Sequence, residues 1–233
     1  VLVKDGTDAM LVLYGNRKTY KDFEVKAEGN LTGLDVHHGG TNAFDGIKYS
    51  LLENIRIDGA TARGFNINQA AFGATLTNCR VSANAADGSE DNCVAFYYIF
   101  EDQEGIGNPT TQTNASVTMN SCNVYNSNAR ANNVTFIQAT RMRSLSVNGA
   151  EVAAGRICSF LQVECEFSGC AFEYISNHST LNNSVVKFDG GTLHTHRVGA
   201  EDWLGDTNLP FGASPGRHIW KCDNASVLDI VGV

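Results

Sequence analysis

The chain has 233 residues, of which 23 are glycine and only 3 are proline, and it carries a formal net charge of −8. Its 17 Lys and Arg residues are scattered singly, which argues against the concentrated basic face that nucleic-acid binding needs. No stretch approaches the roughly 18 consecutive apolar residues of a membrane-spanning helix, so we expect no membrane insertion. We expect one domain over residues 1–233, and because the chain starts at Val1 without an initiator Met, we expect it to be a fragment of a longer protein.

Six-residue segments with one pattern recur along the whole chain. The pattern is a large apolar residue, any residue, a turn-forming residue, a small or apolar residue, any residue, and an apolar residue. The segments are Tyr20–Val25, Leu52–Ile57, Leu76–Val81, Met119–Val124, Val147–Val152, Phe167–Phe172, Phe188–Leu193 and Cys222–Val227. The third position is always Asp, Asn, Ser or Gly, residues that tolerate a left-handed conformation or bond to their own backbone, so each hexamer predicts a bend between two short strands.

The spacing of the hexamers is typical of a solenoid. Their last positions lie 32, 24, 43, 28, 20, 21 and 34 residues apart, around the length that one solenoid coil needs. Each repeat also has a further apolar alternation that predicts a third strand: Phe65 and Ile67, Val94 and Phe96, Val134 and Phe136, Cys158 and Phe160, Val186 and Phe188. The sequence therefore predicts an all-β fold, a single-stranded right-handed parallel β-helix of about eight or more coils with three short strands per coil.

Leucine-rich repeats are the competing architecture, because LENIRI and LTNCRV match their strand segment. That architecture also needs a regular period and an Asn three residues after each strand. Asn84 meets the second requirement, but Glu28, Ala60 and Gly155 stand at the equivalent places. The β-helix is the favoured prediction.

The chain has 7 cysteines, so they cannot all form disulfides within it. The pattern places Cys79, Cys122, Cys170 and Cys222 in the interior, where a thiol behaves as a small apolar group. We expect free, buried thiols and folding in a reducing compartment. The sequence lacks the paired CxxC motifs of a zinc site, and we expect no metal and no cofactor.

The first long interruption of the pattern runs from Ala83 to Asn114 and is rich in carboxylates. Glycoside hydrolysis needs two such groups, at about 5 Å or about 6.5–9.5 Å from each other. We take Glu101, Asp102, Asp87 and Asp91 as the candidate catalytic residues. The alternative is that these are solvated side chains of an acidic loop.

The second interruption, His194 to His218, concentrates aromatic, His, Arg and carboxylate groups. Trp203 is a candidate for stacking on a sugar ring, and Arg197, His196 and Asp206 are candidates for hydrogen bonds to its hydroxyl or acidic groups. An equally good reading is that this excursion covers the coil beneath it or packs against a neighbouring subunit.

With the hexamers and interruptions in place, the chain resembles the pectate-lyase-like β-helix superfamily, and within it the tailspike proteins of bacteriophages. The resemblance implies a homotrimer, located on a virion or outside the cell, that binds and often cleaves bacterial surface polysaccharide, as a glycoside hydrolase or a polysaccharide lyase. The catalytic motifs of pectate lyases and polygalacturonases are absent, so none of their catalytic residues is carried over. The alternative function is a non-catalytic structural or adhesive shaft of a virion or surface protein.

Overall fold

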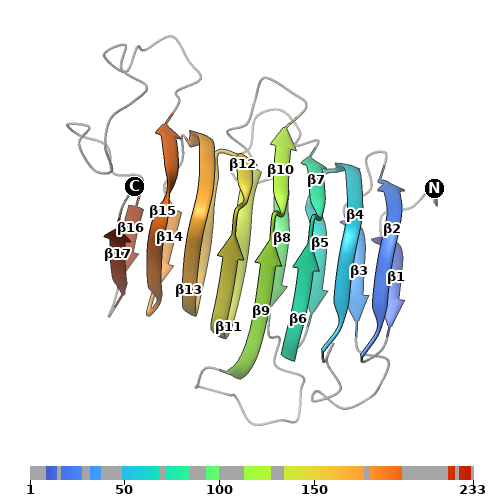
Figure 1. Ribbon diagram of the computed structural model, residues 1–233, viewed down its shortest axis with the longest axis horizontal. Coiled ribbons are helices and arrows are strands. Elements are labelled where there is room, and N and C mark those ends of the chain that lie inside the picture. Colours follow the sequence, from blue (N-terminus) through green and yellow to red (C-terminus); the bar gives the residue numbers. More distant parts are fainter. Residues whose placement is uncertain are drawn as a thin grey trace.

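The computed structural model describes residues 9–14, 17–27, 32–37, 49–68, 72–83, 93–99, 113–126, 134–175, 179–195, 220–223 and 226–231. These residues form strands and short turns and contain no helix, so the all-β prediction is confirmed for this part of the chain. In Figure 1 the strands stand side by side along the long axis of the molecule, with β1 and β2 at one end and β16 and β17 at the other.

Seventeen strands are described, some of them bent so that one strand takes part in more than one set of pairings. The strands are β1 Ala9–Tyr14, β2 Thr19–Lys26, β3 Thr32–His37, β4 Leu51–Ala60, β5 Arg63–Asn68, β6 Phe72–Thr77, β7 Arg80–Ala83, β8 Cys93–Ile99, β9 Thr113–Asn120, β10 Asn123–Asn126, β11 Val134–Asn148, β12 Glu151–Ala153, β13 Arg156–Ile175, β14 Ser179–Asn182, β15 Val185–Thr195, β16 Trp220–Asp223 and β17 Val227–Val231.

All the pairings are parallel, and they fall into three series that the chain visits in a fixed order. The first series is β1, β3, β5, β8, the start of β11, the start of β13, β14 and β16. The second is the start of β2, the start of β4, β6, β9, the end of β11, the middle of β13, the start of β15 and β17. The third is the end of β2, the end of β4, β7, β10, β12, the end of β13 and the end of β15. This all-parallel arrangement is compatible with the predicted β-helix.

The first seven hexamers are in the predicted register. Their last positions pair in sequence as Val25↔Ile57, Ile57↔Val81, Val81↔Val124, Val124↔Val152, Val152↔Phe172 and Phe172↔Leu193. The residue at each third position has a positive φ: Asp22 60°, Asn54 54°, Asn78 52°, Ser121 51°, Gly149 59°, Gly169 59° and Gly190 67°. The expected bend is therefore confirmed at all seven.

The prediction that the eighth hexamer, Cys222–Val227, continues the repeat in register is wrong. Val227 pairs with Val185 and is 52% exposed, and Ile230 takes the partner, Phe188, that the hexamer assigned to Cys222. Cys222 belongs instead to β16 and pairs with Leu181 in the first series. The segment matches the pattern in letters, but the strand that continues the second series begins only at its last residue.

The proposed third strand at Val186 and Phe188 is wrong as well. Both residues lie in β15 within the second series, where Phe188 is the first position of its own hexamer. The first-series strand of that repeat is β14, in which Leu181 pairs with Phe160. The other four apolar alternations do lie in first-series strands.

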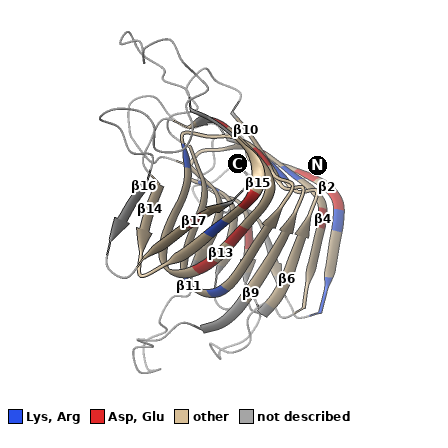
Figure 2. Ribbon diagram, turned by 60° about the vertical axis from the view of Figure 1, so that its left-hand side comes forward, with Lys and Arg blue, Asp and Glu red and all other residues tan. Residues whose placement is uncertain are grey.

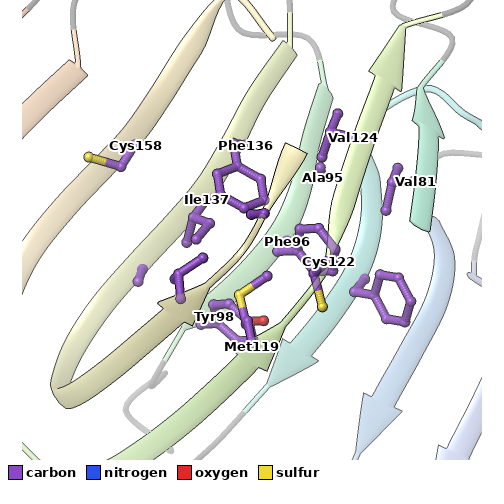
Figure 3. Packing of buried hydrophobic residues seen from close by; sticks show 14 of the residues in the cluster. Val81, Ala95, Phe96, Tyr98, Met119, Cys122, Val124, Phe136, Ile137 and Cys158 are labelled. Atoms are coloured by element: carbon purple, nitrogen blue, oxygen red, sulfur yellow. The ribbon is translucent and has the colours of Figure 1, made fainter. Parts of the chain in front are cut away.

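One hydrophobic core lies between the three series. Phe136, Met119 and Val124 come from the first, second and third series and belong to the same buried cluster (Figure 3). Phe167 of the second series and Phe172 of the third lie 5.5 Å apart between ring centroids. Because apolar side chains of all three series turn inward, each repeat buries its apolar residues only by stacking on its neighbours.

The cysteines of the described hexamers occupy equivalent places in this core. The thiols of Cys79, Cys122 and Cys170 donate to the carbonyl oxygens of Leu52, Leu76 and Val147, at 3.5, 3.6 and 3.4 Å. Each acceptor is the first hexamer position of the preceding repeat. The expectation of free, buried thiols is confirmed for these three; the side chain of Cys222 lies outside the described residues.

The leucine-rich-repeat alternative does not fit the described residues. That architecture has one strand series and a helical segment in many of its repeats, whereas the described ranges contain three strand series and no helix. Among the same residues no helix is long and apolar enough to cross a membrane.

Candidate functional site

The residues proposed from the sequence for catalysis and sugar binding lie outside the described residues. This holds for Glu101, Asp102, Asp87 and Asp91, and for Trp203, Arg197, His196 and Asp206. The described strands nevertheless show where the segments that carry these residues are attached.

Strand β8 divides the first interruption. Asp87 and Asp91 belong to the segment between β7 of the third series and β8 of the first, and Glu101 and Asp102 to the segment between β8 and β9 of the second. The attachment points, Cys93 and Ile99, are opposite ends of a seven-residue strand, a separation of about 20 Å. The strand expected at Val94 and Phe96 is confirmed, and it divides the carboxylate-rich interruption into two segments attached at different places.

The second interruption is attached like the first of these segments. It leaves the third series at the end of β15 and enters the first at β16, the same transition that carries Asp87 and Asp91. The connection from the third series to the first therefore carries both Asp87 and Asp91 in one repeat and Trp203, Arg197, His196 and Asp206 in another. Glu101 and Asp102 lie instead on a connection from the first series to the second.

An uncharged surface of hydroxyl and amide side chains covers the middle of the second series. On each strand these side chains flank a buried first hexamer position. We call the set the hydroxyl–amide surface: Thr75, Thr77, Thr118, Asn120, Ser146 and Asn148. The side chains are partly exposed, and neighbours in register form two rows along the stack.

Within one row, the Asn148 side-chain amide donates to Oδ1 of Asn120 at 3.0 Å. Both residues therefore hold a fixed orientation while presenting further polar atoms outward. No charged residue occurs in β6 or β9, and the described parts of these strands are tan in Figure 2.

Charged side chains border this surface along the stack. On one side, Lys187 on β15 lies 3.3 Å from Glu166 and 3.9 Å from Asp189, and these carboxylates raise the pKa of its ammonium group. On the other side, Glu53 on β4 pairs with Thr77. The neutral area is thus limited to three adjacent strands.

Charged and aromatic side chains on the third series are paired with one another. Arg56 lies 3.5 Å from Glu24, and the guanidinium of Arg80 lies 4.0 Å from the centroid of the Tyr125 ring. The Tyr125 hydroxyl donates to Glu151 at 3.0 Å. Burial is the larger cause, and this hydrogen bond the next, of a raised pKa of the tyrosine. These contacts tie neighbouring repeats together and leave few of the polar atoms for a ligand.

A second polar ladder lies on the first series. Asn66 donates to Asp35 at 3.0 Å and accepts from Arg63 at 3.3 Å, and the Arg63 guanidinium lies 3.7 Å from the centroid of the Tyr97 ring. Asn66 and Tyr97 are only 5% and 7% exposed. The ladder is therefore mostly covered, which favours a structural role.

Sequence reasoning missed the hydroxyl–amide surface, although its signal is present. The residues on either side of the first hexamer position are Thr or Ser and Thr or Asn at Leu76, Met119 and Val147. Both flanking residues are charged at Phe188, and one of them, Lys21, is charged at Tyr20. When the aligned hexamers are extended by one residue at the N-terminal side, the two polar rows of the hydroxyl–amide surface become visible in the sequence.

In the described part of the chain, no group of three His, Cys, Asp or Glu side chains is arranged to hold a metal ion. Comparison with known proteins found no matching protein-family model, no matching curated protein and no matching solved structure.

Proposed function

We propose that this chain binds a bacterial surface polysaccharide, as a phage tailspike-like protein, and that the ligand lies along the hydroxyl–amide surface. The observation that carries the proposal is that surface itself: neutral donors and acceptors at Thr75, Thr118 and Ser146 repeat from strand to strand. A polysaccharide presents hydroxyl groups at regular intervals, so a periodic row of side-chain hydroxyls and amides suits it.

We propose further that the three series are the three faces of a right-handed β-helix of about eight coils. Two observations support this: the chain visits the series in one order, and their inward side chains share one core. Parallel crossover connections are right-handed in about 98% of cases, which supports the handedness.

Cleavage of the bound polysaccharide is part of the proposal. Glu101 and Asp102 belong to one segment and Asp87 and Asp91 to another. Hydrolysis needs a general acid and a second carboxylate roughly 5–9.5 Å apart, so we expect both to come from the same segment. Trp203 would stack on a sugar ring, and Arg197, His196 and Asp206 would bind its polar groups.

We propose that the working form is a homotrimer on a virion or outside the cell, folded in a reducing cytoplasm. The buried free thiols of the core support the folding compartment. A solution mass three times that of the chain, measured by light scattering, is the expected result for the trimer; the mass of a single chain would overturn this part.

The binding proposal is tested with purified capsular and O-antigen polysaccharides and three proteins: the unchanged chain, Thr118→Glu and Thr180→Glu. Thr118 is central in the hydroxyl–amide surface, and Thr180 is a partly exposed threonine on the first series. Binding that is lost in the first variant and kept in the second supports the surface. Absence of binding to every polysaccharide would overturn the function and favour a structural shaft.

Cleavage is tested with any polysaccharide that binds. Glu101→Ala or Asp102→Ala should abolish the release of reducing ends or unsaturated products while binding persists. Release that continues in both variants would remove these two residues from the proposed mechanism.

A further inference from the structure

Tyr49 is the most exposed of the large apolar side chains in the described residues, with 67% of its surface open. Its backbone is also in the left-handed region, with φ 54°. A bulky residue rarely adopts this conformation, because its Cβ crowds the neighbouring carbonyl. The position thus combines an exposed aromatic ring with a strained backbone.

The fold needs this backbone conformation but does not need tyrosine. Among the described residues, positive φ also occurs at five other transitions from the first series to the second, at Arg17 54°, Gly73 69°, Arg141 58°, Gln162 57° and Asn183 48°. Glycine and asparagine adopt this conformation at the least cost. Tyr49 therefore carries a cost in conformational free energy, as Arg17, Arg141 and Gln162 do, and it differs from them in presenting an exposed aromatic ring.

The ring contacts the following repeat along one edge and has a guanidinium of the preceding repeat near it, while 67% of the residue stays exposed. A Cβ at Gly73 would lie only 3.0 and 3.2 Å from two carbons of the Tyr49 ring, so the ring rests against this glycine. The guanidinium of Arg17 lies 5.9 Å from the ring centroid on the preceding repeat. A ring fixed in this way loses little further freedom when a ligand stacks on it.

The ring also adjoins the hydroxyl–amide surface. Gly73, against which the ring rests, lies two residues before Thr75 in β6. The amide of Gly73 donates to the Ser116 hydroxyl on β9 at 3.0 Å, so this edge is tied to the next strand of the surface. Aromatic ring and hydroxyl rows are therefore contiguous.

We propose that Tyr49 is a stacking subsite for one pyranose ring of the polysaccharide, at the edge of the hydroxyl–amide surface. The apolar C–H face of the sugar would lie on the tyrosine ring while the following residues of the glycan bond along Thr75 and Thr118. This inference rests on the proposed polysaccharide binding and adds the residue that anchors it.

The test compares Tyr49→Asn, Tyr49→Phe and Tyr125→Asn with the unchanged chain, using the capsular and O-antigen polysaccharides. Tyr49→Asn should weaken binding about tenfold, which corresponds to about 1.4 kcal/mol. Its melting temperature should not fall, because asparagine suits the backbone. Tyr49→Phe keeps the ring, and Tyr125→Asn removes a ring from the third series, so both should bind within about twofold of the unchanged chain.

The outcomes separate the inference from the function on which it rests. If the unchanged chain binds a polysaccharide and Tyr49→Asn binds it equally well, the stacking subsite is overturned and the function stands. A loss in Tyr49→Phe as large as in Tyr49→Asn would also overturn stacking, since it would assign the effect to the hydroxyl. If the unchanged chain binds no polysaccharide, both are overturned.

Discussion

Val81→Asp should unfold the protein or nearly so. The Val81 side chain is fully buried, and its two methyl groups would lie 2.7 and 2.8 Å from a Cβ at Gly64. Its neighbours in register are Ile57 and Val124, both apolar, so a carboxylate introduced between them would have no partner in the column.

The expected loss can be worked out from two contributions. Removing the buried valine costs about 2 kcal/mol of transfer free energy, and leaving an uncompensated charge in the interior costs about 3–5 kcal/mol. The sum of about 5–7 kcal/mol is comparable with the whole stability of a typical domain, about 5–15 kcal/mol. Lower pH should restore part of the lost free energy of unfolding, because burial raises the pKa of a carboxyl group and favours its neutral form.

The assay is urea denaturation followed by circular dichroism, with Arg80→Asp as the matched control. Arg80 is the adjacent, exposed residue, and its variant loses the contact with Tyr125, which is worth about 0.5–1 kcal/mol. If Val81→Asp is as stable as Arg80→Asp, the inward and outward assignment of the third series is refuted.

Three further changes test other parts of the structure. Burial raises the pKa of the Cys93 thiol from 9.0 to about 12, so between pH 9 and pH 12 the thiol loses its proton only in the unfolded protein. The contribution of this group to the free energy of unfolding is fully present below pH 9 and should fall by about 1.4 kcal/mol per pH unit above it. Urea midpoints across this range should fall less steeply in Cys93→Ala, and equal slopes would contradict the burial of this thiol. Gly169→Ala should cost about 1–2 kcal/mol for its positive φ alone, since no atom of the described residues lies within 4 Å of the added Cβ. Gly191→Ala should cost more than about 3 kcal/mol, because its Cβ would meet the Cys170 carbonyl oxygen; equal losses in the two variants would show that this close approach is absent. Tyr98→Phe should be neutral or stabilising by about 1 kcal/mol, because the buried Tyr98 hydroxyl has no hydrogen-bond partner among the described residues, and a clear fall in melting temperature would show that it has one.

The sequence predicted the second and third series because their bend has a chemical signature. Asp22, Asn54 and Asn78 are residues that accept a left-handed backbone. Their side chains form a ladder, in which Asn54 donates to Asp22 at 2.9 Å and Asn78 donates to Asn54 at 2.8 Å. Where local preference and stacking agree, the pattern is legible in one sequence.

The bend between the first and second series could not be predicted in this way. There the left-handed residues include Arg17, Tyr49, Arg141 and Gln162, which show no preference for that conformation. Stacking on adjacent repeats imposes the conformation on them, and this tertiary effect leaves no local trace. The same gap explains why Tyr49 was not recognised as a candidate.

The eighth hexamer failed for a related reason. Cys222–Val227 satisfies the pattern, but Ser226 occupies the place of Ser184 before the second series begins, so the amide of Ser184 donates to the Ser226 hydroxyl at 3.2 Å. A six-residue pattern contains no information on this contact, which joins residues 42 positions apart.

The central claim is that the repeats are stacked in register from end to end, and a single distance tests it. In the third series Glu24 and Thr192 are separated by six steps through Arg56, Arg80, Asn123, Glu151 and Ala171. At about 4.8 Å per step, spin labels introduced at Glu24 and Thr192 should lie about 29 Å apart by double electron–electron resonance. A distribution centred below about 20 Å or above about 40 Å would contradict the stack, since six parallel spacings cannot produce it.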